Sequence, residues 1–502
     1  MTWHALLPLF VIASSLVPGI VIFTLGEDRQ RLRTALNLGA AVGKVGLVAF
    51  MVYGVAHGVS YEARLPLTSD LDLVLRADPL GVLFVSLSSV LWLLTTVFAI
   101  GYLEPYRNKR RFFGHFSLCV SATVAIALAG NPLTFLFAYE LLTLSTYPLV
   151  VHRGDAAAIR VGRVYLAYTL TGGAGLLVGT VLLYTLAGPI DYAPGGALQI
   201  PGDAGDTALW LLFFWLIASL GVKTALVPLH RWLPDAMVAP TPVSALLHAV
   251  AVVKAGAFGI VRVVYEVYGI AGANELGLLA PLSVVASVTI VYGSLRALRQ
   301  RDLKRRLAYS TVSQVSYIVL GAAIFGPLAT LGGVVHIVHQ GIMKITLFFC
   351  AGAFSETLGI HRVDEMDGIG RRMPLTMVAF TVAAIGMIGL PPTAGFISKW
   401  YLGLGAVSDG QGWVLAVLLA STLLNAAYFL PLIRAGWFGQ RRSPWPRDER
   451  RGRFEGDSWL IAPALVTALL TLLAGVLAAG PVSVQQWAEV IVGQEYVPAS
   501  PR

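Results

Sequence analysis

The chain has 502 residues, of which 56% are hydrophobic and only 13% charged, with a formal net charge of +9. Apolar runs recur from end to end, which excludes a soluble globular protein and predicts an all-α, polytopic membrane protein. The basic residues form short clusters between these runs, a pattern typical of inner loops, so we expect a lipid bilayer and no nucleic acid as partner. The sequence contains no CxxC and no nucleotide-binding glycine motif. We therefore expect no metal and no cofactor in this chain.

Fourteen apolar segments approach the length of about 20 residues that a helix needs to cross a bilayer. No basic region precedes the first segment, so we expect a retained helix rather than a cleaved signal peptide. The split between the fourth and fifth segments depends on the turn signal Gly130-Asn131-Pro132. The predicted segments are 4–25, 33–57, 79–101, 113–130, 132–152, 162–187, 207–235, 241–268, 276–297, 306–326, 328–353, 374–406, 411–436 and 459–481.

Charge alternates between successive loops. The loops after segments 1, 3, 5, 9 and 13 are basic, whereas those after segments 2, 6 and 8 are acidic or neutral. By the positive-inside rule, this alternation predicts a multi-pass protein of the plasma membrane with both termini outside.

Two segments, 207–235 and 374–406, are unusually long and contain prolines: Pro228 in the first, and Pro391 and Pro392 in the second. Proline removes a helical donor, so the freed carbonyls need other partners or water. Paired interrupted helices in two halves of a chain are typical of transport sites. These are the seventh and twelfth segments, five apart. Because successive segments cross the membrane in opposite directions, segments an odd number apart have opposite orientations. Segments 4–8 and 9–13 are therefore predicted to be inverted five-helix repeats. We therefore divide the chain into 1–110 (helices 1–3), 111–270 (first repeat), 271–440 (second repeat) and 441–502 (basic loop, helix 14 and short tail).

The first half carries two ionisable residues deep in its segments. A carboxylate such as Glu140, near the middle of segment five, is costly in a membrane unless it is paired or protonated. An interhelical ion pair and a proton-binding role are compatible interpretations, because a partner controls protonation. Lys223 lies five residues before Pro228. Burial favours its neutral amine and a nearby carboxylate favours its ammonium, so a moving partner would switch its charge, as a proton relay requires.

Segment eight contains His248 and Lys254. Lys254 is too far from either end of the segment for its ammonium to reach the membrane surface easily. For His248, a hydrogen-bonded structural residue and a relay member are equally good interpretations.

In segment eleven, His336, His339 and Lys344 fall within roughly 140° of one another on a helix, which indicates a polar path through the interior. The two histidines could instead bind a metal, but no third ligand lies nearby in the sequence. Lys399 follows the Pro391-Pro392 break and mirrors Lys223. Lys44, in segment two and outside both repeats, is interpreted as structural or lipid-facing. Arg262 and Glu266 are spaced for a local ion pair.

Three stretches resemble the antiporter-like subunits shared by respiratory complex I, membrane-bound hydrogenases and Mrp-type cation/proton antiporters. They are VKTALVPLHRWLPDAMVAPTPVSALLHAVAVVKAG (222–256), RDLKRRLAYSTVSQVSYIVLG (301–321) and GLPPTAGFISKWYL (389–402). The resemblance covers roughly residues 75–440 and implies fourteen helices, inverted repeats and broken helices seven and twelve. It matches the family's ion-path residues to Glu140, Lys223, His248, Lys254, His339, Lys344 and Lys399.

The combination of Lys254, Lys399 and the motif HQGIMK looks most like the D-type component of Mrp antiporters. The resemblance implies partner membrane subunits and transport of protons, with Na+ or K+ as the exchanged cation. The alternative is a proton-pumping subunit of a redox enzyme, such as NADH:quinone oxidoreductase or a hydrogenase. In either case we expect the chain itself to be no enzyme. A non-conducting scaffold is disfavoured, because it would not need so many interior charges.

Overall fold

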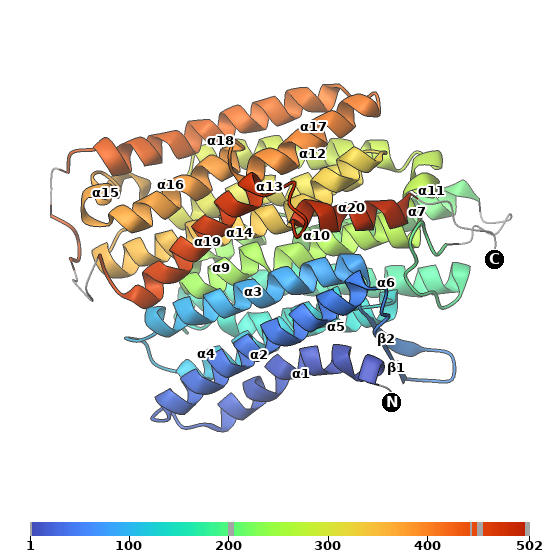
Figure 1. The fold of residues 1–502 in the computed structure, drawn as a ribbon, viewed down its shortest axis with the longest axis horizontal. Coiled ribbons are helices and arrows are strands. Elements are labelled where there is room, and N and C mark those ends of the chain that lie inside the picture. The colour runs from blue at the N-terminus through green and yellow to red at the C-terminus, as the bar shows by residue number, and fades with distance from the viewer. Residues whose placement is uncertain (1–2, 199–204, 442–443, 449–454, 497–502) are drawn as a thin grey trace.

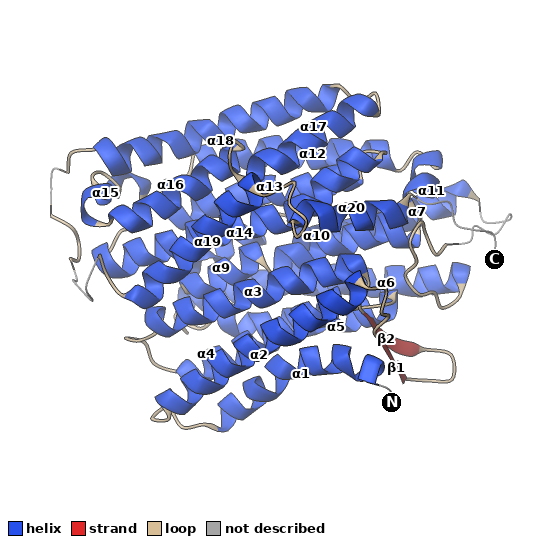
Figure 2. Cartoon of the chain, in the orientation of Figure 1, coloured by secondary structure: helices blue, strands red, loops and turns tan. Residues whose placement is uncertain are grey.

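The computed structural model describes residues 3–198, 205–441, 444–448 and 455–496. Most helices lie side by side and cross the molecule in the same direction or its opposite (Figure 1). The fold is helical apart from one small hairpin (Figure 2). Among the described residues, eleven helices are long and apolar enough to cross a membrane, which confirms a polytopic, helical membrane protein.

The chain begins with three helices and the hairpin, and each of the first three predicted segments coincides with one of these helices. The elements are α1 (Trp3–Thr24), α2 (Gln30–Ala56), β1 (Glu62–Pro66), β2 (Asp72–Arg76) and α3 (Pro79–Tyr102).

The next group of helices covers predicted segments four to eight, and two of these segments are divided. The helices are α4 (Lys109–Ala127), α5 (Pro132–Val150), α6 (Ala156–Ala187), α7 (Asp206–Thr224), α8 (Trp232–Asp235), η1 (Ala236–Val238), α9 (Thr241–Ala249), α10 (Val252–Arg262), η2 (Val263–Val267) and α11 (Ile270–Glu275).

The last group covers segments nine to fourteen. Its members are α12 (Leu279–Leu298), α13 (Leu303–Ala322), α14 (Pro327–Leu358), η3 (Val363–Glu365), α15 (Ile369–Arg372), α16 (Pro374–Ile388), α17 (Ala394–Ser408), α18 (Trp413–Phe438), α19 (Ser458–Val476) and α20 (Val484–Glu495). Because α4, α13, α16 and α17 fall outside the eleven apolar spans, the count of fourteen crossings and the inverted repeat stay predictions.

Loops that follow odd-numbered segments meet at one end of the bundle, which we call the basic end. There the carboxylate of Glu27 accepts from the backbone N–H groups of Lys109 (3.1 Å) and Arg110 (3.2 Å), and Leu303 N donates to His361 O (2.9 Å). Loops after even-numbered segments meet at the opposite end, where Gly130 N donates to the carbonyl of Val74 (2.8 Å). The structure thus groups the loops as their charges predict. Which end faces outward stays a prediction.

The hairpin at the second end pairs Glu62 with Arg76 and Pro66 with Asp72 in antiparallel register. Arg76 bridges Glu62 (2.7 Å) and Asp191 (3.0 Å), which ties the hairpin to the loop after α6. Partial burial raises the pKa of Glu62, but hydrogen bonds from Arg76 and Arg64 outweigh that effect and lower the pKa overall. The hairpin was not predicted, because its short strands lie in an acidic loop.

Within the predicted tail, residues 484–495 form the amphipathic helix α20, which was not predicted. Its Ser483 cap accepts from Gln486 N, as expected for a helix start. Trp487 Nε1 donates to Pro79 O at 2.8 Å, and Gly326 N donates to the hydroxyl of Tyr496 at 2.9 Å. These bonds hold α20 against the starts of α3 and α14. Twelve residues are too few to cross a bilayer, so hydropathy did not reveal this helix.

Candidate functional site

Both predicted helix interruptions are confirmed. Helix α7 ends at Thr224, and Ala225 adopts a left-handed conformation (φ 61°) before the chain resumes as α8 at Trp232. Helix α16 ends at Ile388, and Gly389 (φ 90°) provides the left-handed residue that a helix C-terminus favours. Within the first interruption, Trp232 Nε1 donates to the carbonyl of Val222 (2.7 Å). This carbonyl near the end of α7 is thus satisfied by a protein group, as a membrane interior demands.

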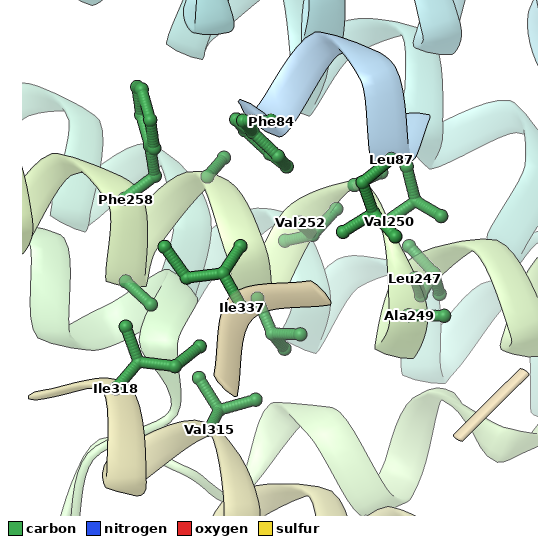
Figure 3. Close-up of a cluster of buried hydrophobic side chains, with 14 of the residues drawn as sticks. Phe84, Leu87, Leu247, Ala249, Val250, Val252, Phe258, Val315, Ile318 and Ile337 are labelled. Carbon is green, nitrogen blue, oxygen red and sulfur yellow. The ribbon is translucent and has the colours of Figure 1, made fainter. Parts of the chain in front are cut away.

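A third interruption was not predicted. Segment eight was interpreted as one helix, but it divides at Val250 and Ala251, between His248 and Lys254. Apolar side chains, among them Leu247, Val252 and Ile337, surround this break (Figure 3). The sequence there is apolar and lacks proline, so no local signal marked the break.

Lys223 contacts Tyr139, the residue that precedes Glu140 on α5. Lys223 is fully buried, donates to the carbonyl of Tyr139 at 2.5 Å and lies 3.3 Å from the centre of the Tyr139 ring. No ion pair within 4.0 Å joins Lys223 to Glu140 in the described structure, and Oε1 of Glu140 is buried without a hydrogen-bond partner there. In this conformation Lys223 therefore binds a neutral carbonyl and not the Glu140 carboxylate.

Gly173 makes room for the Glu140 carboxylate. A side chain at Gly173, on α6, would overlap the carboxylate, whose Oε2 lies 2.9 Å from the position of a Cβ atom. Any larger residue at this position must displace Glu140. Sequence reasoning missed this glycine, because helix–helix contacts are not visible in one chain without a structure.

Lys254 connects α10 to α14. It is 1% exposed, and its ammonium donates to the carbonyl of Ile337 at 2.7 Å. Ile337 is the residue after His336 and lies two positions before His339, so Lys254 contacts α14 beside the two histidines of segment eleven.

His336 continues the line toward α17. Its Nδ1 lies 2.8 Å from the hydroxyl of Ser398, and its ring centre lies 5.2 Å from that of Tyr317. Lys399, next to Ser398, lies 5.4 Å from the centre of the same Tyr317 ring. Lys254 thus contacts α14 at the residue next to His336, and His336 and Lys399 both lie against the Tyr317 ring of α13. We call this arrangement the contact series.

Lys399 reaches back across the break to the end of α16. Its ammonium donates to the carbonyls of Ile388 (2.7 Å) and Met387 (3.2 Å), which are among the last acceptors of that helix. The partial negative charge of a helix C-terminus favours a cation at this place. The aliphatic part of Lys399 packs over Gly389, where a Cβ atom would lie 2.6 Å from Cδ of the lysine.

The remaining predicted residues lie off this series. Lys344 donates to Ser310 Oγ and to Leu307 O (3.5 Å) on α13. His248 stacks on Phe348 (4.8 Å), and neither of its ring nitrogens has a hydrogen-bond partner among the described residues. The Nδ1 atom of His339 is also buried and unpartnered there. Buried polar atoms of this kind are usually satisfied by internal water.

No group of three or more metal-ligating side chains comes together among the described residues. Within the histidine pair of segment eleven, Nδ1 of His336 faces the hydroxyl of Ser398.

Two interpretations of charged residues outside the series are refined. The lipid-facing alternative for Lys44 is wrong, because Lys44 is 0% exposed and donates to Ser15. The ion pair of Arg262 with Glu266 is confirmed, and Arg262 also pairs with Asp78 at 2.8 Å. Arg262 lines a cavity of about 970 Å³ near the second end, together with Glu495 of α20.

Fold and site together define a multi-pass membrane protein with a series of buried cationic side chains and interrupted helices. Residues 129–425 match the family model described as "NADH:quinone oxidoreductase/Mrp antiporter, TM". The chain belongs to this family, which confirms the resemblance inferred from the sequence.

The relatives include NADH-quinone oxidoreductase subunit N of Desulforudis audaxviator, 35% identical over 94% of each chain. Hydrogenase-4 component B of Escherichia coli is 31% identical over 94% of this chain and 72% of its own length. Among solved structures, a chain of the Mrp complex from Dietzia sp. superposes with a TM-score of 0.86 at 24% identity, covering 99% of this chain and 98% of that one. Which component of which complex corresponds to this chain stays a prediction.

Proposed function

We propose that this chain is the proton-translocating subunit of a multisubunit membrane complex that exchanges protons for a monovalent cation. The observation that carries the proposal is the contact series Lys254–Ile337–His336–Ser398, with Lys399 joined through Tyr317, inside the bundle. Buried lysines without adjacent carboxylates are costly, and ionisable residues within membrane segments are typical of ion and proton paths. Similarity to members of proton-linked complexes supports the same conclusion.

In this proposal the first half holds a charge switch. Glu140 and Lys223 flank Tyr139, and their separation in this conformation leaves the lysine bound to a neutral carbonyl. When the carboxylate approaches, it stabilises the ammonium; when it withdraws, the amine loses its proton more easily. Each cycle would move one proton toward Lys254. His248, His339 and Lys344 would act as further proton-binding residues.

Reconstituted vesicles test the assignment. We expect Lys223→Ala and Glu140→Ala to abolish proton flux and the coupled cation flux while the complex still assembles. Undiminished flux from either variant in an intact complex would contradict the assigned roles.

A redox-driven proton pump is the second candidate. It is favoured by the 35% identity to NADH-quinone oxidoreductase subunit N over 94% of both chains. Purification of the intact complex separates the two candidates. Flavin or iron–sulfur absorbance in partner subunits would establish the redox pump, whereas sodium- or potassium-dependent proton flux in a complex without such absorbance would establish the antiporter.

A further inference from the structure

A further buried lysine lies among the first four helices, outside both halves. Lys44 on α2 is 0% exposed, donates to the hydroxyl of Ser15 on α1 at 2.5 Å and lies 4.9 Å from the Trp92 ring on α3. The Ser15 hydroxyl in turn lies 2.7 Å from that of Ser121 on α4. Four helices thus converge on one ammonium group.

This ammonium has no carboxylate within ion-pair distance among the described residues to fix its charge. An ammonium has three donors, and Ser15 is its one hydrogen-bond acceptor in the described part of the chain. The neighbouring helices α1, α3 and α4 present hydroxyls and an indole to it. On α4, His115 and Cys119 contact Phe23 and Thr146, and Lys109, Arg110 and Arg111 lie in its first turn at the basic end. A buried lysine held only by neutral groups can lose and regain its proton wherever water reaches it.

Polar atoms lead from the basic end toward Lys44. Arg33 and Asn37 lie within roughly 40° of Lys44 around α2, and both are buried. On α3, Ser88 and Thr96 lie one turn on either side of Trp92 and are also buried. We call these faces of α2 and α3, with Ser15 and Ser121, the N-terminal seam.

The seam has more buried polar atoms than protein partners for them. The seam atoms without a hydrogen-bond partner among the described residues include Arg33 Nη1, Asn37 Nδ2, Ser88 Oγ, Trp92 Nε1 and Thr96 Oγ1. In a folded protein such atoms are almost always satisfied, and internal water is the remaining partner. Buried polar atoms without a hydrogen-bond partner among the described residues also occur at His248, His339 and Gln340, on α9 and α14.

The two ends of the seam lie where a conducting path needs them. Arg33 is 3.9 Å from Glu27 in the loop between α1 and α2, at the basic end. At mid-bundle, Ser121 belongs to α4, whose Cys119 lies 3.4 Å from Thr146 on α5, the helix that carries Glu140. The seam therefore runs from the basic end to α4, the helix that packs against α5.

We propose that the N-terminal seam is a second hydrated proton path, with Lys44 as its proton-binding residue, that supplies the first half from the basic end. The identity of the transported ion rests on the proposed function; the hydration of the seam does not.

Cysteine accessibility in the assembled complex tests hydration. Asn37→Cys and Thr96→Cys should react with a charged, membrane-impermeant methanethiosulfonate reagent added at the basic end. Val42→Cys, which faces outward on α2 (59% exposed), and Ala122→Cys, buried on α4, are the controls. Labelling of both seam cysteines faster than of both controls supports the proposal. Labelling no faster than of Ala122→Cys would overturn it.

Proton flux in reconstituted vesicles tests the role of Lys44. We expect Lys44→Met to lower flux by roughly tenfold, because a proton-binding site is removed. Lys304→Met is the matched control, since Lys304 donates to a single carbonyl, that of Ala239 (2.6 Å), outside the seam. Native flux in Lys44→Met together with lost flux in Lys223→Met would overturn the seam and leave the proposed function intact. No proton flux from the native complex would instead contradict the proposed function, and the cysteine labelling would then decide the seam alone.

Discussion

The two predicted helix interruptions place a lysine in different surroundings. Lys223 precedes its break, lies in the last turn of α7, and is held by the Tyr139 carbonyl and ring beside Glu140. Lys399 follows its break, is only partly buried, and is held by the last carbonyls of α16. One ammonium thus depends on a carboxylate that can move, whereas the other is stabilised by a fixed helix end.

This difference indicates separate tasks for the two halves. A mobile carboxylate can change the protonation of Lys223 during a cycle, whereas the α16 carbonyls hold the Lys399 ammonium in one position. We therefore expect the first half to switch charge and the second half to receive and pass on protons with less rearrangement.

The largest expected effect is that of Lys223→Met. Removing the group that exchanges the proton should lower proton flux by roughly a hundredfold or more, the range of a lost general acid–base group. Vesicle acidification under an imposed gradient measures it, with Lys304→Met as control. If Lys304→Met lost as much proton flux as Lys223→Met, the effect would be structural and would not support a separate role for Lys223.

Gly173→Val should come next. Its side chain would occupy the place of the Glu140 carboxylate and keep that carboxylate away from Lys223. We therefore expect a loss of proton flux of roughly tenfold. Gly39→Val is the control, because a Cβ atom at Gly39 on α2 meets nothing within 4 Å. A fully active Gly173→Val complex would show that the position of Glu140 is unimportant.

Lys399→Met should affect stability more than flux. It removes two charge-assisted bonds to the end of α16, worth about 2 kcal/mol of unfolding free energy. Thermal unfolding of the purified complex in detergent would measure the loss, and Lys399→Arg should restore most of it. A Lys399→Met complex that is as stable as the native complex but carries no proton flux would contradict this, because Lys399 would then act in proton transfer and not in stability.

The smallest effect is expected for Ser398→Ala. It removes the hydroxyl that faces Nδ1 of His336 without opening a large cavity, and should slow flux by a few-fold. Thr422→Val, at the 3.4 Å contact with Lys399, is a nearby control that leaves His336 untouched. A native rate in Ser398→Ala would remove His336 from the path.

Hydropathy, loop charge and prolines were sufficient to predict the helical fold, the positions of its long helices and both interruptions. Hydropathy reveals apolar segments that are long enough to cross a membrane. The helix α20 and the two strands of the hairpin are shorter than this, so they were not detected. The break at Val250 and Ala251 lacks proline and glycine, and only tertiary packing reveals it.

The ionisable residues were identified because charges are rare in membrane segments, but their partners were not. Tyr139, Ser398 and Tyr317 are ordinary residues in a sequence, and their importance comes from the helices that they face. The same is true of Lys44. The sequence shows that it lies within a membrane segment, but it does not reveal the hydrogen bond to Ser15 on α1 or the contact of Ser15 with Ser121 on α4.

The central claim is that protons cross between the halves through Lys254, the residue that binds α10 to α14. Single-turnover proton flux from vesicles containing Lys254→Met tests it most directly. We predict that proton flux falls as far as in Lys223→Met, while the complex assembles and unfolds as the native complex does. Native proton flux in an assembled Lys254→Met complex would contradict the account.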